Sequence, residues 1–242
     1  MAAQQPHPDT AAFTRVLVIV AHPDDIEWGM AGTVARWVDE GKQVTYLLVT
    51  RGEAGAEDRG LSAAEAAALR EREQRAAAAA VGVHDVRFLD WADDAVYYGP
   101  ELRRALARVI RQVRPEIVMT HQFTHFWGGG QVNHADHRAV GEATMDAILD
   151  ASLHHAFPEL RAEGLEPWRG VKRLYLCGDP QADEAVDVSA TLDRAIAALQ
   201  QHATYMAGLG LDAARLLREQ TAQNGALWGL AHAELYRVVR YE

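Results

Sequence analysis

Residues 16–27 read VLVIVAHPDDIE, an unbroken aliphatic run followed at once by a polar turn. The run at 16–21 contains β-branched valine and isoleucine side chains and no polar residue. Such a run is typical of a parallel strand that helices cover on both faces. We therefore expect residues 16–21 to form a central strand of a sheet.

Strand-like and helix-like segments alternate along the rest of the chain. Further strands are expected at 44–50, 86–89, 117–121, 172–176 and around 186–188. Helices are expected at 29–40, 62–82, 101–113, 136–151, 191–205 and 212–220. This order predicts an α/β fold with a Rossmann-like, doubly wound and mostly parallel sheet that helices flank.

The length and composition predict one domain. The chain has 242 residues, of which 49% are apolar, and this is enough to bury a substantial core. Because the first residues are polar and have no helix or strand pattern, we expect a flexible tail at 1–14 and a single domain at 15–242.

The net charge indicates which classes of binding partner to expect, and the cysteine content indicates the redox state of the compartment. The net charge is −10 and no basic cluster interrupts it, so neither nucleic acid nor an anionic membrane is expected as a partner. Cys177 is the only cysteine and has no intramolecular disulfide partner, which favours a reducing compartment. The chain start lacks a signal-peptide pattern and no aliphatic run is long enough to cross a bilayer. We expect a cytoplasmic protein.

The polar turn behind the first strand is the first candidate site. His22, Asp24, Asp25 and Glu27 lie at the carboxyl end of a predicted strand, where open α/β sheets form their sites. An imidazole and several carboxylates in one place need a cation or a proton to compensate them, which favours a metal. The alternative is that Asp24 or Asp25 caps the following helix and that His22 is a buried, hydrogen-bonded histidine.

A second cluster, NHADHR at 133–138, begins a predicted helix after a long loop. His134 and His137 are three residues apart, so both side chains can face one point at the helix entrance. Two histidines and one aspartate make the ligand set of a catalytic zinc site that keeps one position open. Zinc is expected, and manganese, iron or cobalt would also tolerate these ligands.

Through the stretches AHPDDIEWGMAGT at 21–33 and NHADHRAVG at 133–141, the sequence resembles the LmbE-like or PIG-L zinc deacetylases. Softer similarity runs through TRGEAG, LRERE, RPEIVMTH and AALQQHATYM, and so covers most of the chain. The resemblance implies an LmbE-like fold and removal of an N-acetyl or other acyl group from a glucosamine-type substrate. Ala135 stands where the family usually has proline, which leaves the ligand set intact.

The same resemblance implies a role for each motif residue. It implies three metal ligands: His22, Asp25 and His137. Asp24 would be the general base that accepts a proton from the metal-bound water. His134 would stabilise the oxyanion and later protonate the leaving amine, and Asp136 would orient His134.

Other polar residues near this sheet edge are candidates for the substrate site. The candidate substrate-binding residues are Glu53, Arg70 and Arg51. Each has the alternative interpretation of an ordinary solvated charge, and Arg51 could instead brace its loop. His121 and His125 are candidates for the substrate entrance, whereas His202 on a C-terminal helix is expected to be structural. The partner would be a small amino sugar or related amide, and the resemblance also favours a homo-oligomer.

Three other functions stay open from the sequence. A thiol-conjugate amidase would use the same residues. A metal-dependent phosphoesterase usually needs two metals, whereas only three good ligands are expected to converge. A structural zinc module usually has four ligands rich in cysteine. Covalent catalysis is not favoured, because the sequence contains no G-x-S-x-G motif.

Overall fold

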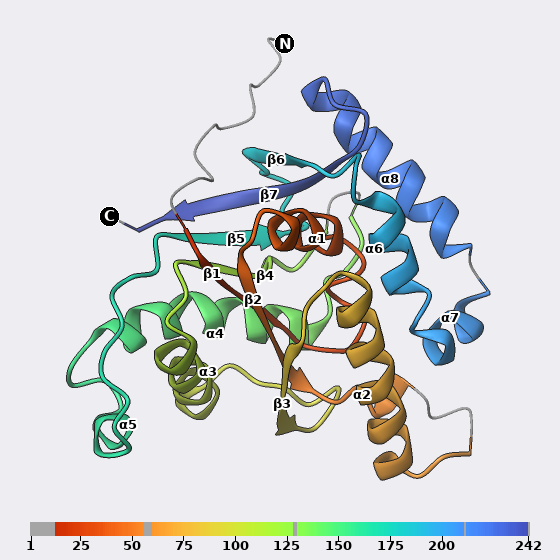
Figure 1. Cartoon of the computed structure of the whole chain (residues 1–242). Coiled ribbons are helices and arrows are strands. Elements are labelled where there is room, and N and C mark those ends of the chain that lie inside the picture. The colour runs from red at the N-terminus through yellow and green to blue at the C-terminus, as the bar shows by residue number, and fades with distance from the viewer. Residues whose placement is uncertain (1–12, 56–59, 128–129, 211, 242) are drawn as a thin grey trace.

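One seven-stranded sheet organises the computed structural model, which describes residues 13–55, 60–127, 130–210 and 212–241 (Figure 1). The strand order is β3-β2-β1-β4-β5-β7-β6. The strands are β1 (Arg15–Val20), β2 (Gln43–Thr50), β3 (Asp85–Trp91), β4 (Ile117–His121), β5 (Arg173–Cys177), β6 (Glu184–Asp187) and β7 (Ala233–Arg240). The helices are α1 (Ala31–Asp39), α2 (Ala63–Ala80), α3 (Pro100–Val113), α4 (Ala135–Ser152), α5 (Pro158–Ala162), α6 (Leu192–Leu199), α7 (Ala203–Leu209) and α8 (Ala213–Trp228).

The strands β1 to β5 pair in parallel, which confirms the predicted Rossmann-like, mostly parallel sheet. Strand β7 runs antiparallel between β5 and β6. The sequence analysis predicted neither β7 nor the short helix α5. Charged residues interrupt the apolar pattern of β7, whose sequence is AELYRVVR, so its strand character depends on the neighbours with which it pairs.

The run VLVIVA is buried on both faces of the sheet, as expected for a central strand. Val16, Val18 and Val20 belong to one hydrophobic cluster, which also includes side chains of α1, α2 and α6. Leu17 and Ile19 belong to the opposite cluster, with side chains of α3 and α4. Each fully buried aliphatic side chain contributes about 1.5–3 kcal/mol to the free energy of folding. This short run therefore stabilises the packing of helices on both faces of the sheet.

The structure confirms the predicted start of one helix and differs from the prediction at a second helix and at the N-terminal tail. Ser62 and Glu65 form the predicted capping box at the start of α2. The helix predicted at 191–205 is two helices, α6 and α7, which are separated at His202. Phe13 is buried against the edge of Trp37 with the ring centroids 5.1 Å apart, so the packed chain includes a residue of the predicted tail. Residues 1–12 of that tail lie outside the described residues.

The loops that carry the site leave the carboxyl ends of the parallel strands. Strand β1 lies between β2 and β4, so the polar turn behind β1 is flanked by the segments that follow those strands (Figure 1). Among the described residues, no helix has the length and the apolar character needed to cross a bilayer.

Candidate active site

The polar turn after β1 presents its carboxylates to the site and does not use them to cap a helix. The N–H of His22 donates to Oδ2 of Asp25 at 2.7 Å, and Asp24 has a left-handed backbone with φ of 83°. Such backbone strain outside glycine is concentrated at functional sites. Helix α1 begins at Ala31 with Met30 as its N-cap, and no side chain caps it. The alternative that an aspartate of this turn caps α1 is therefore wrong.

The three predicted metal ligands converge on one point. Nδ1 of His22 lies 3.2 Å from Nε2 of His137, and this Nε2 lies 3.0 Å from Oδ1 of Asp25. The third separation, from Nδ1 of His22 to Oδ2 of Asp25, is 3.5 Å. A tetrahedral zinc ion with bonds of about 2.0–2.1 Å holds its ligands roughly 3.3 Å apart. These three side chains therefore fit a single divalent cation.

Carboxylates on the far side of His22 fix the orientation of its ring. Nε2 of His22 lies 3.1 Å from Oδ2 of Asp136 and 3.0 Å from Oδ1 of Asp93. A ligand histidine usually donates its second N–H to such a carboxylate, which leaves the other nitrogen free for the metal. Asp136 was expected to orient His134, but only its backbone N–H reaches Nδ1 of that residue, at 3.2 Å. The Asp136 carboxylate orients His22 instead.

The charge balance of the cluster also suits a cation. Burial alone would lower the pKa of His22, but Asp136 and Asp25 together raise this pKa to about 12. Burial would raise the pKa of Asp25, yet His137 and His121 hold it well below its ordinary value. The ionised carboxylates therefore favour a positive charge on the groups between them. Either a proton on a histidine or a metal ion can supply that charge.

His121 is a second candidate for the third ligand position. Asp25, His121 and His137 bring ligand atoms close enough together for a metal. Nε2 of His121, however, lies 3.1 Å from both the backbone nitrogen of Ala21 and Oδ2 of Asp25, so this nitrogen already has two protein partners. Burial lowers the pKa of His121 to about 4, and the ring stacks on His137 with the centroids 4.1 Å apart. His22 is therefore the better candidate for the third ligand, and His121 contacts the cluster by stacking on His137.

His121 and His125 were both candidates for the substrate entrance. His121 is only 3% exposed, so it forms part of the floor of the site. His125 is exposed and does not belong to the lining of either cavity described below.

Asp24 is held next to the ligands without joining them. Its Oδ2 accepts from Nη2 of Arg70 at 2.6 Å, and its backbone N–H donates to Oε1 of Gln74 at 3.0 Å. Burial raises the pKa of Asp24 to about 6, although Arg70 acts in the opposite direction. Arg70 is 2% exposed and also donates to the carbonyl oxygen of Pro23. Arg70, a candidate substrate-binding residue, therefore mainly fixes Asp24.

The other two candidate substrate residues lie outside the lining of both cavities. Oε1 of Glu53 accepts the backbone N–H of Asp93 at 3.0 Å, so Glu53 fixes the loop after β3. Arg51 forms an ion pair with Asp90 at 2.8 Å and is partly exposed. This contact agrees with the alternative interpretation that Arg51 braces its loop.

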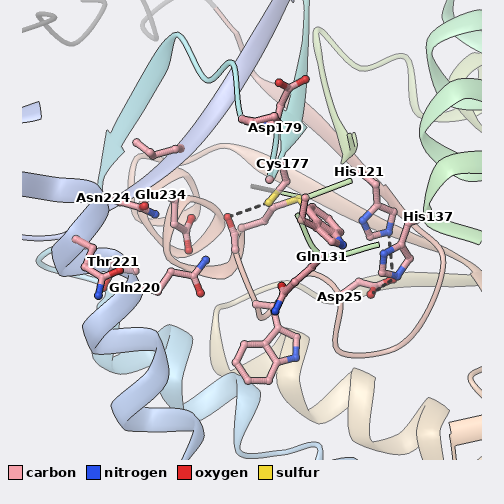
Figure 2. Close-up of a pocket in the computed structure, with 18 residues that line it drawn as sticks. Asp25, His121, Gln131, His137, Cys177, Asp179, Gln220, Thr221, Asn224 and Glu234 are labelled. Atoms are coloured by element: carbon pink, nitrogen blue, oxygen red, sulfur yellow. Dashed lines mark hydrogen bonds and ion pairs between the residues drawn. The ribbon is translucent and has the colours of Figure 1, made fainter. Parts of the chain in front are cut away.

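Two cavities meet at Asp25 and His137. The smaller one, of about 280 Å³, contains Asp24 together with His134. The larger one, of about 760 Å³, extends from the metal cluster towards α8 (Figure 2). His134 is exposed, and its Nε2 lies 2.9 Å from Oδ1 of Asp94. The proton-carrying groups therefore face the smaller cavity.

The sequence analysis missed several residues of the site. They are Asp93, Asp94 and Tyr205. Trp127, which follows His121 and His125 in the chain and was a candidate for the substrate entrance with them, lines the larger cavity. The two aspartates follow β3, so the rule that sites form at the carboxyl ends of strands could have found them. Tyr205 carries no such signal, because packing between distant segments brings it to the smaller cavity.

Comparison with known proteins agrees with this geometry. Residues 17–148 match the PIG-L family model, which is described as GlcNAc-PI de-N-acetylase. This match includes every predicted metal ligand and extends over more than half of the chain. The chain belongs to the PIG-L family. The predicted fold and family resemblance are thus confirmed.

Individual relatives extend the similarity beyond the family match. Diacetylchitobiose deacetylase of Thermococcus kodakarensis is 31% identical over 189 residues, which cover 78% of this chain and 68% of the relative. A 1D-myo-inositol 2-acetamido-2-deoxy-alpha-D-glucopyranoside deacetylase of Kineococcus radiotolerans is 28% identical and covers 93% of this chain and 77% of its own. The structure of N,N'-diacetylchitobiose deacetylase from Pyrococcus horikoshii, bound to an inhibitor, superposes with a TM-score of 0.86 at 25% identity over 95% of this chain and 85% of its own.

Proposed function

We propose that this PIG-L protein is a metal-dependent amide hydrolase that removes an N-acetyl group from a glucosamine-type small molecule. The observation that carries the proposal is the convergence of His22, Asp25 and His137 beside an aspartate that is not a ligand. A structural metal site has no use for such a buried carboxylate. The names of the relatives, which are deacetylases of acetylated amino sugars, support the same reaction.

The proposed metal is zinc, bound by His22, Asp25 and His137. Two imidazole nitrogens and one carboxylate oxygen suit zinc with one position left for water or substrate, and other divalent transition metals would fit the same donors. When bound, the ion would act as a Lewis acid that polarises the amide carbonyl and lowers the pKa of water towards about 7.

Asp24 is the proposed general base. Its carboxylate lies in the smaller cavity, where it can accept the proton of the attacking water. Arg70 holds one oxygen of this carboxylate at 2.6 Å, which leaves the other oxygen for the proton transfer. The hydrogen bond from the Asp24 backbone to Gln74 fixes the left-handed turn that aims the side chain.

His134 is the proposed donor to the developing oxyanion and to the leaving amine. It precedes α4 and lines the smaller cavity together with Asp24. Asp94 contacts its Nε2 at 2.9 Å, and the Asp136 backbone N–H contacts its Nδ1, so both nitrogens are held. Because Nδ1 accepts a backbone N–H, the ring proton lies on Nε2, and this proton would pass from Asp94 to the developing charge to lower the barrier.

The direct test is amine release from acetylated amino sugars. Protein purified without added metal would be assayed on N-acetylglucosamine and its glycosides, before and after treatment with a chelator and after zinc is added back. We expect release that chelation abolishes and zinc restores. No release in any of these states, from protein shown to be folded, would overturn the proposal.

Two competing reactions are separable by experiment. A thiol-conjugate amidase would use the same residues, so parallel assays on an amide thiol conjugate and on an amino sugar distinguish the two. A two-metal phosphoesterase would require a second ion about 3.5–4 Å from the first. Phosphate release from a phosphomonoester, with no amine release from sugars, would favour that reaction.

We further propose a cytoplasmic location and a small-molecule amino sugar or related amide as the partner. The free cysteine, Cys177, is consistent with a reducing compartment. The homo-oligomer implied by the family resemblance stays a prediction, and light scattering on the purified protein would measure it.

A further inference from the structure

Two paths of buried hydrogen bonds begin at Asp24, one at its carboxylate and one at its backbone N–H. Arg70 holds the carboxylate and Gln74 holds the N–H. These two residues are four positions apart on α2, so they face the polar turn from the same side of the helix. The residues that contact Arg70 and Gln74 in turn therefore bear on the position of Asp24.

The first path leads from the Asp24 carboxylate through Arg70 to Glu73. Nη2 of Arg70 donates to Asp24, whereas Nη1 of Arg70 donates to Oε2 of Glu73 at 3.2 Å. Oε1 of Glu73 accepts the backbone N–H of Thr204 at 2.7 Å. All four residues are buried. Both oxygens of the Glu73 carboxylate therefore face N–H donors, and the path ends in the first turn of α7.

The second path leads from the Asp24 backbone through Gln74 and Glu27 to His202. The side-chain amide of Gln74 accepts from the Asp24 N–H and donates to Oε1 of Glu27, each at 3.0 Å. Oε2 of Glu27 lies 3.2 Å from Nε2 of His202. The side chains of Gln74, Glu27 and His202 are fully buried. The two paths thus end at neighbouring positions around the start of α7.

The backbone of Asp24 depends on such contacts. Its φ of 83° lies in the left-handed region, which a residue other than glycine keeps only where the surrounding structure holds it. The Gln74 amide is the group that binds the N–H of this strained residue. A loosened contact would therefore let the turn relax and move the carboxylate.

The proposed metal ligands are held independently of both paths. Asp25 accepts from the backbone N–H of His22 at 2.7 Å. It also contacts Nε2 of His137 at 3.0 Å and Nε2 of His121 at 3.1 Å. None of these partners belongs to α2 or α7. A change in either path should therefore displace Asp24 and leave the metal ligands in place.

We propose that Glu73 and Glu27 are positioning residues of the proposed base, through which the start of α7 holds Asp24 in its reactive orientation. The inference rests on the proposed function and adds two residues to its machinery. Neither glutamate lines either cavity, so each acts only through Arg70 or Gln74. The C-terminal part of the chain thereby contributes to the rate of the reaction without touching the substrate.

The same substitution should have opposite outcomes at the two glutamates. Glu73→Gln places an amide that has a single acceptor oxygen against two N–H donors, so one donor loses its partner. Glu27→Gln keeps an oxygen for Gln74 and turns its NH₂ group towards His202. The ring of His202 can accept that bond by changing tautomer, because its Nδ1 has no hydrogen-bond partner among the described residues.

The test measures kcat, KM and zinc affinity for wild type and variants shown to be folded by thermal melting. The substrate is whichever of N-acetylglucosamine and N,N'-diacetylchitobiose the wild type cleaves faster. Glu73→Gln should lower kcat about ten- to hundredfold, as expected for a misplaced reacting group, with KM and zinc affinity within about threefold of wild type. Glu27→Gln should keep kcat within about threefold, whereas Glu27→Leu, which removes both contacts, should lose about as much as Glu73→Gln.

A control and a reserve variant complete the design. Glu71→Gln changes another glutamate of α2, which pairs with Arg75 at 2.7 Å on the outer side of the helix, and should keep the wild-type kcat. If Glu73→Gln does not fold, Glu73→Asp takes its place with the same expected loss, because the shorter side chain cannot reach both donors.

Three results would overturn the inference. The first is a wild-type kcat in Glu73→Gln or in Glu27→Leu. The second is an equal loss of kcat in Glu73→Gln and Glu27→Gln, which would indicate a role of the charge alone. The third is a fall in zinc affinity that accompanies the loss of kcat, because the two paths would then act on the metal ligands. Absence of amine release from either sugar by the wild-type protein would instead overturn the proposed function, and the inference with it.

Discussion

Residues 17–148 and the C-terminal remainder of the chain contribute different chemistry to one site. The first region supplies the proposed reacting groups, which are His22, Asp24, Asp25, His134 and His137. The second region supplies Tyr205 to the smaller cavity and the polar face of α8 to the larger one. The comparison teaches that short motifs at strand ends carry the reaction, whereas packing between distant segments shapes the space around it.

Buried contacts join the two regions. His202, at the start of α7, lies 3.2 Å from Oε2 of Glu27, and both side chains are fully buried. Oε1 of Glu27 accepts from the side chain of Gln74, which also binds the Asp24 backbone. The structural role expected for His202 agrees with these contacts. The segment that carries Tyr205 is thus fixed to the same side chains that hold Asp24.

The largest effect is expected where the metal cluster is broken. His137→Ala removes a ligand, so bound metal and amine release should fall together, the latter by at least about a thousandfold. Elemental analysis and the amine assay measure the two losses. The matched control is His125→Ala, an exposed histidine of the preceding loop, which should keep both. Normal metal content in His137→Ala would remove this residue from the ligand set.

The next effect separates the base from the ligands. Asp24→Asn keeps the shape of the side chain but removes the proton acceptor, so kcat should fall by about 10²–10⁴-fold while the metal stays bound. Asp90→Asn, at an exposed carboxylate next to Arg51, serves as the control. Full turnover in Asp24→Asn would show that another group accepts the proton.

A smaller effect is expected for the carboxylate behind His22. Asp136→Asn weakens the hydrogen bond to Nε2 of His22, so metal affinity should fall by about 10–100-fold. Competition with a chromophoric chelator would measure the affinity. If the affinity stays at the wild-type value, Asp136 does not orient this ligand, and Asp93 on the same nitrogen would be the next residue to test.

The smallest effect is expected in the C-terminal region. The Tyr205 ring covers Arg70, with the guanidinium 5.3 Å from the ring centroid. Tyr205→Ala should therefore lower kcat/KM by about two- to tenfold, whereas Tyr205→Phe, which keeps the ring, should stay near the wild-type value. A fall in kcat/KM of a hundredfold or more in Tyr205→Phe would show that the hydroxyl group takes a direct part in the reaction. The C-terminal region would then supply a reacting group as well, contrary to the difference drawn between the two regions.

The sequence allowed the central strand and both metal motifs to be predicted, because their signals are local. VLVIVA is buried on both faces, and the capping box of Ser62 and Glu65 forms as expected. Strand β7 could not be predicted, since its residues become a strand only through pairing with β5 and β6. The orientation of Asp136 towards His22 was also missed, because sequence spacing does not tell which neighbour a side chain faces.

The measurement that tests the central claim most directly is a zinc titration of the metal-free protein with amine release as the readout. The account predicts that release from an acetylated amino sugar rises with added zinc and reaches its plateau at one equivalent per chain, and that His137→Ala shows no rise. Release that is independent of zinc, or that needs two equivalents to reach the plateau, would contradict a single catalytic metal held by His22, Asp25 and His137.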